Sequence, residues 1–180
     1  MRAVEIELSG VLEEEELEYY GGTFSFRENI RLGGTGSPKV YYNDGIPEFD
    51  EMNEYVENEV SFVSFEMMKK GLILRLNRTQ RMRCVGALWT DIKEIRLRGY
   101  RKEVQYRRFL YKREIVHRGL LEVEEFDGTI SRFHVPEQNF TGLQKYFSKA
   151  IFQNFFVYAL GTSPPDPSDL KLLDFLDDFV

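Results

Sequence analysis

The chain has 180 residues, of which 42% are hydrophobic and 30% charged, and no apolar run approaches the roughly 20 residues that a membrane-spanning helix needs. A single cysteine excludes an internal disulfide, and the acidic N-terminus is not typical of a secretory signal, so we expect a cytoplasmic protein. The net charge of −6 is unevenly distributed, because residues 1–67 carry −12, residues 68–118 carry +12 and residues 119–180 carry −6. Such segregation indicates a face that binds polyanions, pairing of charges within the protein, or both.

The acidic first third of the chain, residues 1–58, predicts an extension with one or two strands. Apolar and polar residues alternate over residues 3–12, which predicts a strand, and the run Glu13 to Glu16 should be solvated. The sequence GGTFSFRENIRLGG, bounded by glycine pairs, predicts a second short strand. Residues 33–58 are rich in turn-forming residues and predict loop, with a helical turn near Phe49 to Tyr55.

From residue 59 the chain shows repeated strand patterns separated by turn signals. These patterns predict seven strands, at residues 59–66, 71–77, 81–88, 91–98, 103–112, 119–126 and 129–135. The turn between the fourth and fifth strands is expected at Gly99 to Lys102. Period-two alternation places leucines such as Leu74 and the cysteine Cys84 inside. It places five arginines together on the outer face: Arg75, Arg81, Arg83, Arg96 and Arg98.

A helix is predicted from Pro136 to Leu160, followed by a proline-rich linker and an acidic amphipathic tail helix within residues 161–180. The long helix is apolar on two sides, so one stripe covers the sheet and the outer stripe must be covered by another surface. The tail helix is too short to be stable alone in water and should fold only when it docks, either on its own domain or on another chain. The interaction candidates on these two segments are Phe152, Phe156, Leu173, Phe175, Leu176 and Phe179.

Seven strands followed by one helix resemble the pleckstrin-homology-like fold, including its GRAM and bacterial branches. The resemblance covers residues 59–160 and rests on GLILRLN, RMRCVGALWTDIKEIRL, LEVEEFDGTISRFHV and the helix from Pro136 to Leu160. It implies a mainly β fold, either a barrel or a rolled antiparallel sheet of about seven strands, capped by one helix. It further implies a scaffold that recognises lipids, peptides or partner domains.

The basic block supplies the candidate residues for polyanion binding. They are Lys69, Lys70, Arg75, Arg78, Arg81, Arg83, Arg96, Arg98, Arg101 and Lys102. Tyrosines interleave with these residues, so such a surface would hold phosphates by charge and bases by stacking. The alternative interpretation is internal, with acidic segments of the protein covering the same face.

No catalytic set is recognisable in the sequence. His117 and His134 lack a nearby second ligand, and Cys84 is predicted as a small core residue. The glycine-rich segments lack the residue order of a phosphate-binding loop. We therefore expect no metal, no cofactor and no enzymatic activity.

The expected function is that of a protein-interaction or scaffold module. It would self-associate or bind a protein partner through the outer helix face and the acidic-aromatic tail. The alternative is a binder of nucleic acid or anionic membrane through the arginine-rich sheet face.

Overall fold

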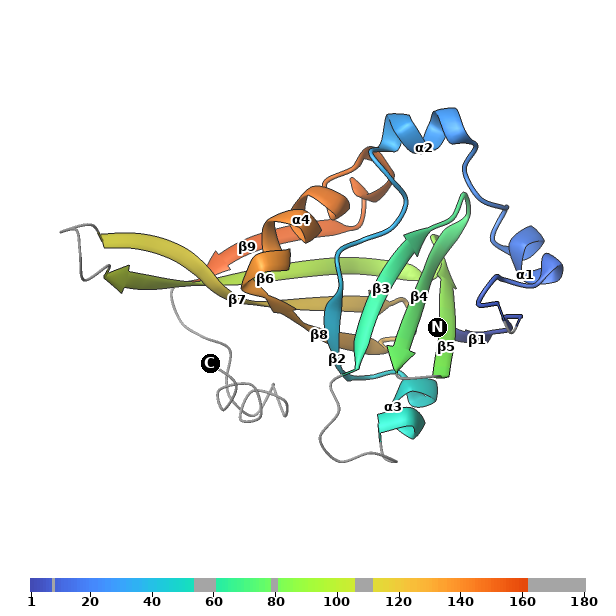
Figure 1. The fold of residues 1–180 in the computed structure, drawn as a ribbon, viewed down its shortest axis with the longest axis horizontal. Coiled ribbons are helices and arrows are strands. Elements are labelled where there is room, and N and C mark those ends of the chain that lie inside the picture. The colour runs from blue at the N-terminus through green and yellow to red at the C-terminus, as the bar shows by residue number, and fades with distance from the viewer. Residues whose placement is uncertain (8, 54–60, 79–80, 106–111, 162–180) are drawn as a thin grey trace.

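The computed structural model describes residues 1–7, 9–53, 61–78, 81–105 and 112–161, which form one mixed sheet with short helices around it (Figure 1). The strands are β1 (Arg2–Val4), β2 (Val40–Asp44), β3 (Phe62–Met67), β4 (Gly71–Arg78), β5 (Arg81–Leu88), β6 (Ile92–Gln105), β7 (Lys112–Glu125), β8 (Ile130–Pro136) and β9 (Phe156–Gly161). The helices are α1 (Glu14–Tyr19), α2 (Phe26–Leu32), α3 (Pro47–Asn53) and α4 (Glu137–Phe147), with a 3-10 turn at Ala150–Phe152.

The order of strands in the sheet is β1-β5-β4-β3-β2-β8-β7-β6-β9. Neighbours are antiparallel except β6 and β9, which are parallel. The predicted mainly β fold is thus confirmed. The sheet is not closed into a barrel, because β1 and β9 remain its two edges.

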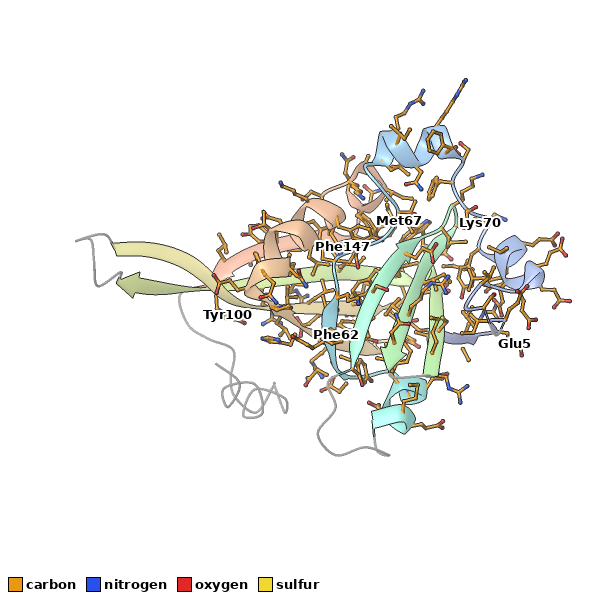
Figure 2. All side chains as sticks on the ribbon, viewed as in Figure 1. Glu5, Phe62, Met67, Lys70, Tyr100 and Phe147 are labelled. Carbon is orange, nitrogen blue, oxygen red and sulfur yellow. The ribbon has the colours of Figure 1, made fainter. Side chains whose placement is uncertain are left out.

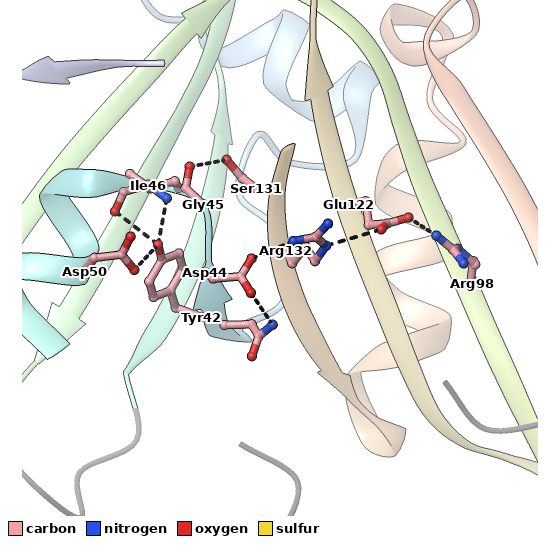
Figure 3. Close-up of polar contacts among 10 residues, drawn as sticks. Tyr42, Asp44, Gly45, Ile46, Asp50, Arg98, Glu122, Ser131 and Arg132 are labelled. Atoms are coloured by element: carbon pink, nitrogen blue, oxygen red, sulfur yellow. Dashed lines mark hydrogen bonds and ion pairs between the residues drawn. The ribbon is translucent and has the colours of Figure 1, made fainter. Parts of the chain in front are cut away.

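Strand β2 joins the two halves of the sheet. It pairs with β3 on one side and with β8 on the other, so it links the β3–β4–β5 and β6–β7–β8 meanders. Tyr42 anchors β2, since its buried hydroxyl donates to the Asp50 carboxylate at 2.7 Å and accepts from the Ile46 N–H at 2.7 Å (Figure 3). The acidic first third of the chain therefore supplies two strands of the sheet, β1 and β2. Asp50 lies in α3, close to where the sequence predicts a helical turn.

The main core lies between the sheet and α4. Leu72, Leu74 and Leu76 are fully buried there, as predicted, and Phe140 and Phe147 of α4 cover them and their neighbours. Each such side chain contributes about 1.5–3 kcal/mol to the free energy of unfolding through removal of apolar surface from water.

A second, smaller core lies on the opposite face of β4 and β5. It contains Val4, Leu12, Tyr20, Met68, Ile73 and Cys84. The N-terminal segment covers this face, so β4 is apolar on both sides. Cys84 is buried, as expected, but it lies with Ile73 and not with the leucines.

The predicted strand in GGTFSFRENIRLGG is wrong, because this segment forms α2. Ser25 and Glu28 form a reciprocal capping box, in which each side chain accepts a hydrogen bond from the other residue's backbone N–H. Gly33 ends the helix with a left-handed φ of 66°. The predicted strand at residues 3–12 is also shorter than expected, since β1 stops at Val4 and only an isolated bridge joins Ile6 to Leu12.

The run Glu13 to Glu16 is only partly solvated. Glu13, Glu14 and Glu15 are exposed, but Glu16 is buried and forms an ion pair with Arg2. The acidic residues in the first turn of α1 are favourable at the positive end of a helix.

The turn predicted at Gly99 to Lys102 is wrong, because β6 runs through it. Gly99 pairs with Gly119 of β7, and both glycines make room for the ring of Phe140. A Cβ atom would lie 2.5 Å from Phe140 Cζ at Gly99 and 2.6 Å from Phe140 Cδ2 at Gly119. Gly99 therefore marks a close packing contact with Phe140 within a long strand, and not a turn.

The helix predicted from Pro136 to Leu160 is wrong beyond Phe147. The helix α4 ends there, and β9 forms from the aromatic and β-branched residues that follow. Each of the two apolar stripes of the predicted helix is therefore divided between α4, the 3-10 turn and β9.

Candidate functional site

Three of the arginines on the outer face of β6 to β8 converge on one carboxylate, that of Glu122. Arg98 donates to Glu122, and Arg132 Nε lies 3.6 Å from it (Figure 3). Arg96 lies 3.3 Å from the same carboxylate. The register explains this convergence, because Arg96 of β6 and Arg132 of β8 both pair with Glu122 of β7. The Glu122 side chain is only 9% exposed, and the three arginines offset the cost of burying its carboxylate.

The remaining carboxylates balance this arginine cluster. Arg132 also binds Asp44 of β2 at 3.1 Å, and Arg96 also binds Glu94. The three cations therefore meet four carboxylates, those of Asp44, Glu94, Glu122 and Glu124. Most of these carboxylates belong to β6 and β7, and only Asp44 belongs to the acidic first third of the chain.

Arg75 and Arg83 lie on opposite faces of the sheet, which corrects the prediction of a single outer arginine face. Arg75 pairs in register with Cys84, whereas Arg83 pairs with Leu76 on the leucine side. Arg75 is held by Glu66 at 2.8 Å, while Arg83 is exposed. Because successive side chains alternate, a shift of one residue in the assumed register moves each arginine to the other face.

The other polyanion candidates are dispersed. Lys69 and Lys70 are exposed at the turn from β3 to β4, where the backbone N–H of Lys70 donates to Tyr20. In Figure 2, Lys70 and Tyr100 lie well apart along the long axis of the molecule. The backbones of the remaining candidates lie in β4, β5 and β6, and their side chains lie outside the described residues: Arg78, Arg81, Arg101 and Lys102.

Of the predicted interaction residues of the helix, Phe152 lies in the main core and Phe156 packs against it. Phe152 is fully buried between Trp89 and Phe147, with ring centroids at 5.5 and 5.0 Å. Phe156 of β9 stacks on Phe147 at 5.8 Å. These contacts follow from the end of α4 at Phe147, which turns the expected outer stripe into the core. The tail candidates Leu173, Phe175, Leu176 and Phe179 lie outside the described residues.

Strand β9 presents an apolar edge that sequence reasoning missed. Its inner neighbour is β6, and among the described strands none pairs with its other side. Val157 and Leu160 remain 44% and 40% exposed. The sequence has no Asp, Glu, Lys or Arg from residue 150 to residue 165, so the charges that commonly protect an edge strand are missing. The uncharged run is the signal that could have located this site.

A cavity of about 420 Å³ lies at the opposite edge of the sheet, between β1, α1 and the turn after β7. Arg2, Tyr19 and Tyr20 line one side, and Glu125, Phe126 and Asp127 are among the residues of the other. Burial raises the pKa of Tyr20 to about 12, although the nearby Arg2 opposes that rise. The lining therefore combines a neutral phenol with the Arg2 guanidinium and the carboxylates of Glu125 and Asp127.

The structure describes the side chains of two of the nucleophile and metal candidates, Cys84 and His134. Burial raises the pKa of the Cys84 thiol, with Arg75 acting in the opposite direction, so the thiol is poorly suited to attack. His134 is buried and stacks on Tyr41 at 5.8 Å, and the side chain of His117 lies outside the described residues. The described residues contain no group of three or more His, Cys, Asp or Glu arranged to hold a metal ion.

Comparisons with known proteins give no relative: no family model, curated protein or solved structure matches the chain. Within the described ranges, no helix is long and apolar enough to span a membrane.

Proposed function

We propose that this chain is a non-catalytic protein-interaction module that self-associates through β9. The observation that carries the proposal is the apolar, uncharged edge of β9. An unpaired strand edge offers a row of backbone donors and acceptors to another strand. Docking on such an edge gains affinity from main-chain hydrogen bonds and specificity from alternate side chains.

A second copy of β9 is the occupant that fits this edge. Two copies related by a two-fold axis would pair their edges antiparallel, with the same patch used on both sides. No like charges would oppose each other, because β9 carries none. The chain's own continuation is a poor alternative strand, since Pro164, Pro165 and Pro167 follow β9 closely and proline cannot donate to a ladder. The other edge, β1, has only three residues and is followed by Glu5.

The substitution Val157→Lys tests this proposal, because an edge lysine opposes strand pairing. We expect the wild type to have twice the chain mass of 21.3 kDa and the variant to have the single mass, as measured by light scattering after gel filtration. Val11→Lys is the matched control, since Val11 is 53% exposed and lies far from β9 in the sheet order. Loss of the dimer in both variants, or in neither, would refute pairing through β9.

We further propose that the scaffold belongs to the pleckstrin-homology-like class. Support comes from the seven strands β2 to β8, which run in chain order and lead directly into α4. The seven strands differ from those expected from the sequence. The expected strand at residues 103–112 has its first residues in β6 and its last in β7, and β2 is the additional strand that makes the number seven. This fold class implies a scaffold for partner recognition. The fold alone does not specify the partner, which depends on the strand edge and the surface that the chain exposes.

The alternative expectation, polyanion binding through the arginine-rich face, has less support. Arg96, Arg98 and Arg132 are paired with carboxylates, so their face carries little excess charge. The excess positive charge of the chain lies further along β6 and β7.

A further inference from the structure

We propose that the cavity between β1, α1 and the turn after β7 binds a small organic amine that carries an aromatic ring and an oxygen acceptor. The residues that line it all belong to the described part of the chain. Its volume of about 420 Å³ lies at the small end of the range of ligand pockets, roughly 300–1,000 Å³. The cavity lies at the β1 end of the sheet, so the proposal does not depend on self-association through β9.

The two positive groups of the lining each already meet a carboxylate. Arg2 forms an ion pair with Glu16, and the α-amino group of Met1 forms one with Glu125. The side chains of both glutamates are largely buried, so these pairs are satisfied within the protein. The lining therefore offers little positive charge to an anionic ligand.

The lining has two further carboxylates, those of Asp91 and Asp127. Neither forms an ion pair with a residue that the structure describes. The Asp91 carboxylate accepts from the Thr90 hydroxyl at 3.2 Å, and that of Asp127 accepts from the Thr129 N–H at 2.8 Å. The hydrogen bonds from Thr129 lower the pKa of Asp127, so its carboxylate is ionised at neutral pH. The excess charge of the lining is therefore negative, which favours a cationic ligand.

Aromatic rings supply the apolar part of the site. Tyr19 and Phe126 line the cavity and are 45% and 70% exposed. The Arg2 guanidinium lies over the Tyr19 ring, with its Cζ atom 4.2 Å from the ring centroid, so this lining already holds one cation against an aromatic face. Most of the Phe126 ring remains open, and an aromatic ring of a ligand would cover it.

The hydroxyl of Tyr20 is a buried donor of the lining. Tyr20 is fully buried, and no described residue forms a hydrogen bond with its Oη atom. This atom lies against Gly86, another lining residue, where a Cβ atom would be only 2.3 Å from it. Burial raises the pKa of Tyr20 to about 12, although Arg2 opposes that rise, so the hydroxyl keeps its proton at neutral pH. Because a buried donor without an acceptor is unfavourable, an oxygen on the ligand gains affinity here.

An amine with a ring and an oxygen satisfies these groups together. Its ammonium group meets Asp91 and Asp127, its ring packs on Phe126, and its oxygen accepts from the Tyr20 hydroxyl. Tyramine has all three parts and serves as the probe.

Titration of the full-length protein with tyramine, followed through amide chemical shifts, tests the site. We expect saturable shifts at lining residues such as Gly86 and Asp127, with a Kd of about 1 mM or tighter. The anion 3-(4-hydroxyphenyl)propanoate has the same ring and hydroxyl but a carboxylate in place of the amine, and it should bind at least about tenfold more weakly. Equal binding of the two compounds, no saturation with tyramine, or shifts confined to other parts of the protein would overturn the proposal.

The variant Asp91→Asn/Asp127→Asn tests the two carboxylates. It removes both charges and keeps the side-chain oxygens that accept hydrogen bonds, so the fold should persist. Tyramine binding should weaken at least about tenfold. The matched control Glu14→Gln/Glu15→Gln removes two exposed charges of α1 that do not line the cavity, and it should change the Kd by less than about twofold. Unchanged binding in the first variant, or an equal loss in both, would contradict a cation site.

The substitution Tyr20→Phe isolates the hydroxyl. The fold should tolerate it, because no described residue loses a hydrogen bond to Oη. Tyramine binding should weaken by about threefold to tenfold, whereas binding of phenethylamine, which lacks the oxygen, should stay the same. An equal effect on both amines, or on neither, would overturn the assignment of an oxygen-bearing ligand.

Discussion

At the scale of single residues, glycines and buried carboxylates decide the geometry of the long strands. Gly99 and Gly119 let the Phe140 ring lie flat against β6 and β7, which fixes α4 on the sheet. The sequence marks both glycines, but a glycine signals either a turn or a close approach, and only the position of Phe140 separates the two. Glu122 is a similar case, because its role depends on arginines from two neighbouring strands.

The substitution Gly119→Ala should destabilise the protein by about 1–3 kcal/mol, because its Cβ overlaps Phe140 and the packed core must shift. Urea unfolding gives this free energy. Gly36→Ala is the control, since nothing lies within 4 Å of a Cβ at Gly36, and it should change the free energy by less than about 0.5 kcal/mol. Similar losses in both variants would show that the Phe140 contact is not the cause.

At the scale of elements, the sequence correctly predicts helices and strands that have a strong local pattern. The prediction fails where the same residue pattern is compatible with either a helix or a strand. The alternation in β4 and the turn before β8 give strands as predicted, because each has a clear period and a clear boundary. The residues from Phe152 to Leu160 continue the helical spacing of α4 by coincidence, and they instead form a turn and β9. In GGTFSF the alternation predicts a strand, but the capping box of Ser25 and Glu28 favours helix α2.

The substitution Ser25→Ala should accelerate amide exchange within α2, because the side-chain acceptor of the Glu28 N–H is lost and a helix cap contributes about 1 kcal/mol. No residue of α2 is buried, so the effect should stay local and leave the midpoint of global unfolding nearly unchanged. Ser25→Asp keeps a side-chain acceptor and serves as the control. Unchanged exchange in Ser25→Ala would show that the cap does not hold the helix.

At the scale of the whole molecule, the fold pairs only part of the basic residues of the sequence with carboxylates. The sequence predicts either internal pairing or an exposed basic face, and Arg75, Arg96 and Arg132 follow the first alternative. The face of each arginine was not predictable from alternation alone, since β4 and β5 have a core on both sides. The edge position of β9 was not predictable either, because strand order depends on contacts between segments far apart in the chain.

The central claim, self-association through β9, is tested most directly by sedimentation equilibrium of the wild-type protein at low and at high salt. The account predicts a dimer of twice 21.3 kDa in both conditions, because the strand edge is uncharged and apolar contacts are not screened. A single species of 21.3 kDa at every concentration would contradict the claim, as would a dimer that dissociates when salt is added.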